Sequence, residues 1–191
     1  IYTAFGSAIH SVCEEKLLNE TLDEKKHFQT KFLEELGSLP ENIKSNLNKK
    51  MINDMRSQGD MLSSLVIPEL KNHFKDFKVI SVEEQLYEPI ENSDKMYKGF
   101  IDLILKTKDG KYHVIDWKTC SWGWDSRRKN EKMVTYQLAY YKHFFSKKHN
   151  IDPEDIETHF ALLKRTAKSN KVEIFRVTSG NKKIENSLKL L

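Results

Sequence analysis

Two aspartates and a lysine stand in or beside apolar runs of the sequence, where charged side chains are costly to bury. Asp102 lies in the run Ile101-Asp102-Leu103-Ile104-Leu105, and Asp116 and Lys118 flank Trp117 at the end of another. Neighbouring carboxylates repel each other, and a divalent cation offsets both the repulsion and the cost of desolvation. Such a cation can also activate a water and stabilise charge on a phosphate. These residue types therefore indicate metal-assisted phosphate chemistry, with Lys118 orienting the water or stabilising the transition state.

The turn Lys108-Asp109-Gly110 predicts how the two strands pair. A three-residue hairpin loop that ends on glycine in the left-handed region would pair Thr107 with Lys111. Residues at equal distances from that pair lie opposite each other and point to the same face, so Asp102 would lie opposite Asp116. A two-residue loop would shift the pairing by one residue and put the two carboxylates on opposite faces. Their convergence is therefore a specific structural prediction.

Lys118 shares the face of Asp116, because side chains alternate along a strand. The other face receives apolar residues, which are Ile101, Leu103, Leu105, Ile115 and Trp117. The short motif alone is weak evidence, because an acidic residue two positions before a lysine also occurs at Glu14-Glu15-Lys16 and Glu69-Leu70-Lys71. A structural ion pair between Lys118 and one aspartate is the alternative to an active site.

The first 77 residues follow a helical period. Apolar residues recur at helical spacing in residues 5–18 and 22–36. A third helix is expected from the capping box Ser38-Leu39-Pro40-Glu41 to Gly59, and a fourth from Asp60, as its cap, to residue 77. This part of the chain is therefore expected to be mostly helical.

Residues 78–191 alternate between strand and helix patterns. Strands are expected at 79–87, 97–107, 111–118, 158–165 and 171–177, with a helix at 131–148 and a short helix at the C-terminus. The predicted fold class is α/β, with a mixed central sheet flanked by helices and an N-terminal helical layer. The length of 191 residues suits a single domain that spans residues 1–191.

The composition is that of a globular chain with a mild excess of positive charge. Apolar residues make up 38%, charged residues 31%, and the formal net charge is +4. This charge permits a polyanionic partner, although lysine clusters are also common on solvated surfaces. No apolar run is long enough to span a bilayer, so no membrane partner is expected. Because the sequence begins with Ile1 rather than Met, we expect it to be part of a longer chain.

The cysteine content also limits the possible sites. Cys13 and Cys120 are the two cysteines of the chain, and they cannot supply the four ligands of a cysteine-rich zinc site or an iron–sulfur cluster. We therefore expect no iron–sulfur cluster. Isolated cysteines are typical of a reducing, intracellular compartment.

Four motifs occur in an order that resembles a known family. They are Phe5-Gly6-Ser7-Ala8-Ile9-His10, Gly99-Phe100-Ile101-Asp102, Val114-Ile115-Asp116-Trp117-Lys118-Thr119 and Gln137-Leu138-Ala139-Tyr140-Tyr141. Together they resemble the motif set of RecB-like nucleases of the PD-(D/E)XK superfamily. The last core strand of that family can be matched to residues 158–165. The resemblance implies a core like that of restriction endonucleases.

The resemblance implies a role for each matched residue. Asp102 and Asp116 would bind the catalytic Mg²⁺ or Mn²⁺, together with His10 and the backbone carbonyl of Trp117. Lys118 would act on the attacking water. Without the other motifs, a lone histidine at this position would be read as a structural residue.

The helical motif and the preceding strand would add further residues to the site. Gln137 and Tyr141 would line the site and contact a substrate phosphate, and their spacing of four places them on one helix face. Packing between helices is the alternative role for this pair. Glu84 would have a supporting role at most.

The loop after Lys118 combines aromatic and basic residues. Trp122 and Trp124 could stack on unpaired bases while Arg127 and Arg128 follow the backbone of the strand. Burial of the two tryptophans as anchors for the loop is an equally open alternative.

We therefore expect a deoxyribonuclease that hydrolyses phosphodiester bonds with Mg²⁺ or Mn²⁺, as an exonuclease on single strands or ends of DNA. The family branch without an iron–sulfur cluster, which includes the mitochondrial genome maintenance exonuclease and phage relatives, fits best. Three alternatives remain open. They are a structure-specific or restriction-type endonuclease, a nucleic-acid-binding module with a silent site, and a metal-binding structural domain without salt-dependent DNA binding.

Overall fold

A computed structural model describes all of residues 1–191, which form two compact units. The helical unit comprises Ile1–His73, Lys118–Gly123 and Leu162–Glu173. The sheet unit comprises Phe74–Trp117, Trp124–Ala161 and Ile174–Leu191. The single domain expected from the chain length stays a prediction.

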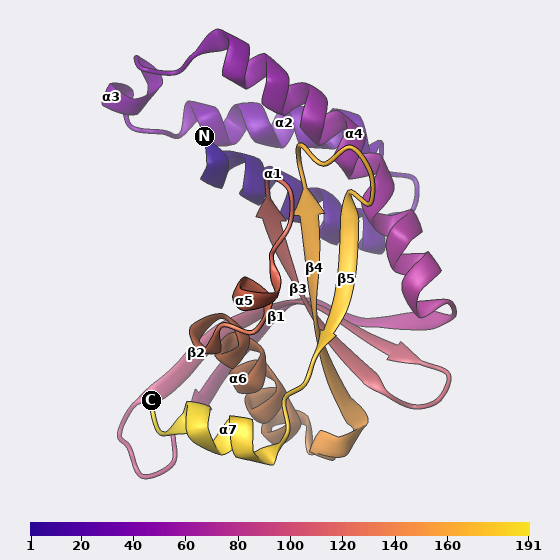
Figure 1. Cartoon of the computed structure of the whole chain (residues 1–191), viewed down its shortest axis with the longest axis vertical. Coiled ribbons are helices and arrows are strands. Elements are labelled where there is room, and N and C mark those ends of the chain that lie inside the picture. Colours follow the sequence, from indigo (N-terminus) through magenta and orange to yellow (C-terminus); the bar gives the residue numbers. More distant parts are fainter. The chain divides into compact units, whose positions relative to one another are not determined.

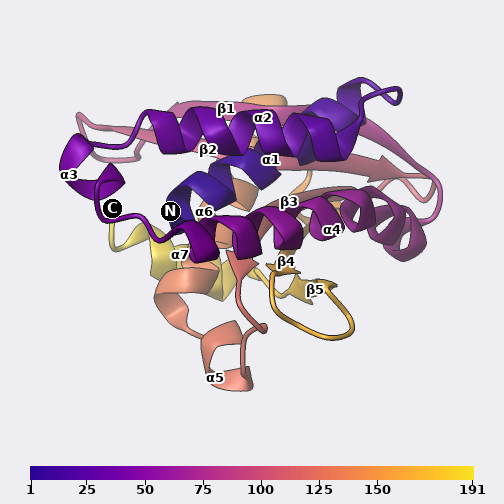
Figure 2. The same cartoon turned by 90° about the horizontal axis from the view of Figure 1, so that it is seen from above.

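The helical unit is built from α1 (Tyr2–Leu18), α2 (Glu24–Gly37), α3 (Glu41–Lys44) and most of α4 (Lys49–Phe74) (Figures 1 and 2). Aromatic rings form its centre. The ring centroids of Phe5 and Phe28 lie 5.4 Å apart, and Phe28 stacks on Phe32 at 5.5 Å. The helices predicted at 5–18 and 22–36, and the helical N-terminal layer, are confirmed.

The predicted break between two helices at Gly59 is wrong. α4 runs through this position as one helix of 26 residues and also contains Pro68. A Cβ on Gly59 would lie 1.9 Å from Cζ of Phe28, so the glycine admits an aromatic ring rather than ending a helix. Asp60, expected as a cap, instead accepts a hydrogen bond from Nε2 of Gln29 at 2.8 Å. Packing between α2 and α4 therefore decides the role of both residues.

The predicted capping box at Ser38 is also wrong. Ser38 is the C-terminal cap of α2, and its hydroxyl donates to the Glu35 carbonyl at 2.8 Å. The helix that follows, α3, ends after one turn at Lys44. Asn48 then accepts a hydrogen bond from the Lys50 N–H at 2.8 Å and provides the polar start of α4.

The five strands form one sheet in the order β1-β2-β3-β4-β5. They are β1 (Phe77–Pro89), β2 (Met96–Thr107), β3 (Tyr112–Cys120), β4 (Ile156–Lys164) and β5 (Val172–Val177). In Figure 1 the arrows of β3 and β4 point the same way and that of β5 points the opposite way, so the sheet is mixed. The predicted strands and the α/β class are confirmed.

The helices after β3 are α5 (Ser126–Lys129), α6 (Lys132–His149), the 3-10 turn η1 (Pro153–Asp155) and α7 (Asn181–Leu188). Phe144 of α6 stacks on Tyr97 with ring centroids 4.2 Å apart. The apolar residues predicted for the core are each at most 1% exposed, namely Ile101, Leu103, Leu105, Ile115 and Trp117. None of the helices combines the length and the apolarity that a bilayer crossing requires.

Candidate active site

The hairpin that carries the two aspartates has the predicted three-residue loop. The Thr107 N–H donates to the Lys111 carbonyl at 3.0 Å, and the Gly110 N–H donates to the Thr107 carbonyl at 3.0 Å. Gly110 has a φ of +88°, in the region that favours glycine. β2 and β3 then pair with Leu105 opposite His113, as this loop requires. The two-residue loop is thereby excluded.

The hairpin holds Asp102 beside the strand that carries Asp116. The ladder between β2 and β3 ends at the pair Leu103 and Ile115, and one further step along this register would place Asp102 opposite Asp116. Oδ2 of Asp102 accepts a hydrogen bond from the Trp117 N–H at 2.7 Å, which holds this carboxylate against β3. Asp116 is only 2% exposed. A buried carboxylate with a second one beside the same strand fits a divalent cation, and the oxygen donors suit Mg²⁺ or Mn²⁺.

Gln137 and Tyr141 lie one turn apart on α6, as predicted, and Nε2 of Gln137 donates to Oη of Tyr141 at 2.8 Å. Burial raises the pKa of the Tyr141 phenol, and the negative charge of Asp116 and, more weakly, of Asp102 raises it further. The phenol therefore stays protonated and remains able to donate a hydrogen bond. The charges of both carboxylates therefore act on the Tyr141 phenol.

Tyr97, at the start of β2, was not among the predicted site residues. Burial raises the pKa of its phenol, with smaller electrostatic contributions from Tyr140 and Asp116. A Cβ on Gly99 would lie 2.9 Å from the Tyr97 hydroxyl oxygen. The glycine of the second motif therefore leaves room for this side chain, and it was the sequence signal that could have pointed to Tyr97.

His10 and Lys118 belong to the helical unit. His10 is half-buried on α1, next to the fully buried Ile9, and Lys118 is half-buried on β3. One turn before His10, a Cβ on Gly6 would lie 3.3 Å from Oγ1 of Thr119. The glycine of the first motif thus lets α1 lie against the residue that follows Lys118.

The two tryptophans of the loop after β3 have different environments. Trp122 is 76% exposed. Trp124 is half-buried, and its ring packs edge-on against Phe160 at 5.2 Å and against Phe175 at 6.5 Å. The exposed ring is available to stack on a base, whereas Trp124 anchors the loop to the sheet unit.

The two arginines of the loop lie on α5 and are both exposed. The guanidinium of Arg128 lies 5.5 Å from the centroid of the Trp124 ring and pairs with Glu131 at 2.6 Å. Arg128 is thus held in place by its neighbours. Arg127, beside it, presents its charge to solvent.

Glu84 on β1 is engaged by the end of α6. Its Oε1 lies 2.7 Å from Nζ of Lys148 and 2.8 Å from Nε2 of His149. The Ser81 hydroxyl donates to its Oε2 at 2.6 Å. Burial tends to raise the pKa of the Glu84 carboxyl, but the hydrogen bonds from Lys148, Ser81 and His149 outweigh it and hold the pKa at about 2. This carboxylate ties the C-terminal end of α6 to β1.

A second group of ligating side chains was not predicted. His113 on β3 and Glu157 and His159 on β4 have donor atoms within 4.8 Å of one another. The spacing of two between Glu157 and His159, at the start of the strand predicted at 158–165, was the signal available in the sequence, because residues two apart in a strand share a face.

Comparisons with known proteins identify the family to which the sequence is similar. The family model of the PD-(D/E)XK nuclease superfamily matches residues 2–187, which is nearly the whole chain. No curated protein sequence matches the chain.

Two solved structures are similar to this chain. A protein from Eubacterium rectale with the provisional name exonuclease has a TM-score of 0.53 and 10% identity, covering 87% of this chain and 59% of its own. This likeness concerns the fold alone, and the chain spans less than two thirds of that protein. A structure named SSO0001 has 16% identity over 97% of this chain and 85% of its own, with a TM-score of 0.41 that is too low to carry an argument.

Proposed function

Because the chain belongs to the PD-(D/E)XK nuclease superfamily, we propose that it hydrolyses DNA phosphodiester bonds with Mg²⁺ or Mn²⁺. The observation that carries this proposal is the burial of Asp116 next to Trp117, whose N–H donates to a second carboxylate, Asp102. A divalent cation, when bound, would supply positive charge to the phosphate and an activated water. We further propose that the enzyme is an exonuclease that acts on single strands or ends.

The residues of the hairpin and of α1 have distinct roles in this proposal. Asp102 and Asp116 would hold the cation, with the backbone carbonyl of Trp117 and the imidazole of His10 completing the donor set. Three oxygen donors and one nitrogen suit Mg²⁺ or Mn²⁺. The Lys118 ammonium would orient the water and stabilise the negative charge that develops on the phosphate.

The side chains of α6 would position the substrate. The Tyr141 phenol, which burial and the nearby carboxylates keep protonated, would donate a hydrogen bond to a phosphate oxygen. Gln137 donates to the Tyr141 hydroxyl and would orient it. Tyr97 has a similarly protonated phenol in the same neighbourhood and would assist. Glu84 would support the site indirectly, by fixing α6 to β1.

The preference for unpaired DNA rests on the loop after β3. The exposed Trp122 would stack on a base, and Arg127 and Arg128 on α5 would follow the phosphate backbone. Because the ring of Trp124 packs against Phe160, this second tryptophan would support the loop rather than the substrate.

We also propose that the enzyme works without an iron–sulfur cluster, in the RecB-like branch of the superfamily and in a reducing intracellular compartment. Its two cysteines fall short of the four cysteine ligands of such a cluster. Cys13 is buried on α1. Burial raises the pKa of the Cys120 thiol, which keeps it protonated and unreactive.

The test is digestion of end-labelled substrates. Linear single-stranded and double-stranded DNA, RNA of the same sequence and circular single-stranded DNA are incubated with Mn²⁺, with Mg²⁺ or with EDTA. We expect short products from one end of linear single-stranded DNA, no product with EDTA, and an intact circle. Cutting of the circle would replace the exonuclease by an endonuclease. DNA binding without cleavage in either cation would contradict the proposed activity.

A further inference from the structure

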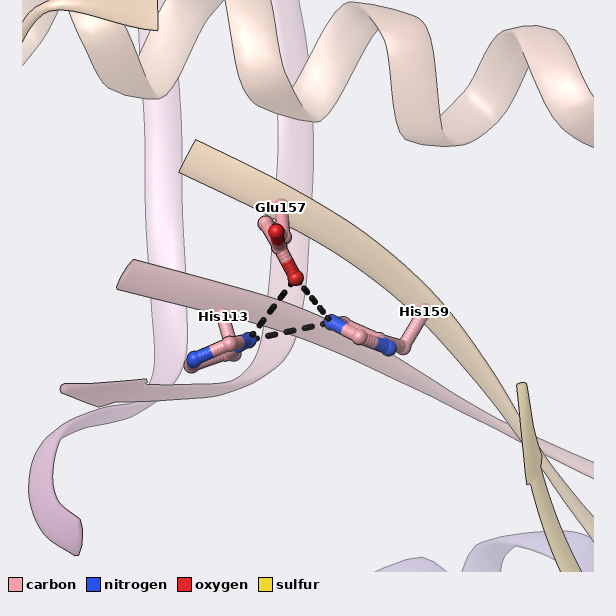
Figure 3. Close-up of side chains that lie close together, drawn as sticks. All are labelled: His113, Glu157 and His159. Carbon is pink, nitrogen blue, oxygen red and sulfur yellow. Dashed lines mark hydrogen bonds and ion pairs between the residues drawn. The ribbon is translucent and has the colours of Figure 1, made fainter. Parts of the chain in front are cut away.

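Two histidines and a glutamate converge on neighbouring strands of the sheet unit (Figure 3). Nδ1 of His113 lies 3.1 Å from Nε2 of His159, and Oε2 of Glu157 lies 3.7 Å and 3.8 Å from these two nitrogens. The point equidistant from these three atoms is about 2.1 Å from each, within the range of zinc–ligand distances, about 2.0–2.2 Å. The donor atoms therefore already have the separations that a bound transition-metal ion imposes.

The hydrogen bonds around His113 direct a lone pair into the group. Thr107 Oγ1 donates to Oδ1 of Asp109 at 2.5 Å, so the same oxygen can accept from Nε2–H of His113 at 2.9 Å. This tautomer leaves the Nδ1 lone pair pointing toward Glu157 and His159. Imidazole ligands of metals are commonly held by such a bond on the other ring nitrogen.

The carboxylate of Glu157 is oriented in the same way. Arg176 pairs with its Oε1 at 3.1 Å, which leaves Oε2 on the side of the two imidazoles. One carboxylate oxygen of Glu157 is therefore available as a ligand.

Phe74 covers the two imidazoles. Its ring centroid lies 4.8 Å from that of His113 and 5.1 Å from that of His159. His113 is 7% exposed and His159 is 3% exposed. The nitrogens are therefore held in a largely dry environment, and Glu157, with a side chain 22% exposed, leaves an entry for an ion.

We infer that His113, Glu157 and His159 form a second metal site, selective for a transition-metal ion of the Zn²⁺ class. Two imidazole nitrogens and one carboxylate oxygen suit Zn²⁺ or Co²⁺, whereas a donor set made mostly of nitrogen suits Mg²⁺ poorly. His113 lies three residues before Asp116, so the two point to opposite faces of β3. The ion would join β3 to β4 through ligands 46 residues apart. The cysteine content argues only against cysteine-rich zinc sites and leaves this one open.

The experiment measures metal binding in the full chain, in a double variant Asp102→Asn with Asp116→Asn that removes the proposed catalytic ligands. After EDTA treatment, the protein is titrated with Zn²⁺ and Co²⁺, and bound metal is counted by mass spectrometry. We expect one Zn²⁺ per chain and a higher melting temperature with Zn²⁺. We also expect a visible absorption band typical of a Co²⁺ ion with a low coordination number. Because the proposed catalytic ligands are absent, the result does not depend on nuclease activity.

Three substitutions in the same background locate the site. Glu157→Gln keeps the size of a half-buried side chain and should weaken Zn²⁺ binding at least about ten-fold. His159→Ala should abolish it. His143→Ala, which removes a half-buried histidine on α6 outside the group, is the matched control and should bind as before. Less than a tenth of an ion per chain, or equal affinity in folded Glu157→Gln and His143→Ala, would overturn the site.

Discussion

Asp116 is the charged residue whose placement most needs a chemical reason. It is 2% exposed in the middle of β3, and a second aspartate, Asp102, accepts a hydrogen bond from the N–H of the next residue, Trp117. Burial and a like charge both oppose ionisation of a carboxyl, and a bound cation removes both effects. Oδ2 of Asp102 already accepts the Trp117 N–H at 2.7 Å, so the pair is positioned by the backbone of β3.

Substitutions at the hairpin should separate the loss of the cation from the loss of transition-state stabilisation. Asp116→Asn should abolish cleavage and weaken Mn²⁺ binding, because a charged ligand is lost. Lys118→Ala should slow single-turnover cleavage about 10²- to 10³-fold, as removal of one stabilising donor does, with Mn²⁺ affinity retained. Single-turnover kinetics and Mn²⁺ titration calorimetry measure the two effects. Wild-type cleavage in either folded variant would refute the assignment.

Substitutions of the two loop tryptophans should have different effects, one on DNA binding and the other on stability. Trp122→Ala should weaken binding of single-stranded DNA about ten-fold at fixed salt, since stacking of one base contributes about 1–3 kcal/mol. Trp124→Ala should mainly lower the melting temperature, because its ring packs on Phe160 and Phe175. Fluorescence anisotropy with a labelled oligonucleotide and thermal denaturation distinguish the two. Normal DNA binding by Trp122→Ala would contradict stacking of Trp122 on a base.

At the scale of the elements, the hairpin could be predicted, but the helix boundaries at Ser38 and Gly59 could not. The loop at Lys108–Gly110 is determined by local turn chemistry, and its register follows from the loop length. The role of Gly59 depends on Phe28, which is distant in sequence and reaches it only after α2 and α4 pack. A local pattern cannot distinguish a glycine that ends a helix from one that admits a ring. The group of His113, Glu157 and His159 could not be predicted from a local pattern either, because its members lie on two different strands.

Gly59 provides a direct test of that packing. Gly59→Ala puts a methyl group where Cζ of Phe28 lies 1.9 Å away, and displacing the ring should cost about 1–3 kcal/mol of unfolding free energy. Gly37→Ala is the control, because a Cβ at Gly37, the last residue of α2, meets nothing within 4 Å. It should change stability by less than about 1 kcal/mol. Urea denaturation measures both, and equal stability of the two variants would contradict the close contact.

The contacts of Glu84 between β1 and α6 should make the stability of the protein depend on pH. Its folded pKa of about 2 lies below the ordinary 4.5, so its stabilisation is complete above pH 4.5 and is lost as the pH falls toward 2. Glu84→Gln should destabilise the protein by about 1–3 kcal/mol at pH 7, as loss of hydrogen bonds to a charged group does. The difference from wild type should shrink below pH 4.5 and vanish near pH 2. Denaturation across this range, with exposed Glu83→Gln as control, measures it; a pH-independent difference would contradict the ion pairing.

At the scale of the whole molecule, the chain combines a superfamily match over residues 2–187 with a mild net charge of +4. The superfamily match indicates a nuclease, but the fold does not define the substrate, because one fold carries many functions. The small net positive charge permits a polyanionic partner but does not by itself indicate one. Specificity must therefore come from particular side chains, of which Trp122 and Arg127 are the exposed candidates near the end of β3.

The central claim is that the two hairpin carboxylates hold a divalent cation. Anomalous scattering from crystals soaked in Mn²⁺ locates the ion directly. We expect a peak about 2.1 Å from carboxylate oxygens of both Asp102 and Asp116, and its loss in crystals of Asp116→Asn. Anomalous peaks confined to other positions, with none in coordination distance of Asp116 in wild-type crystals, would contradict the account.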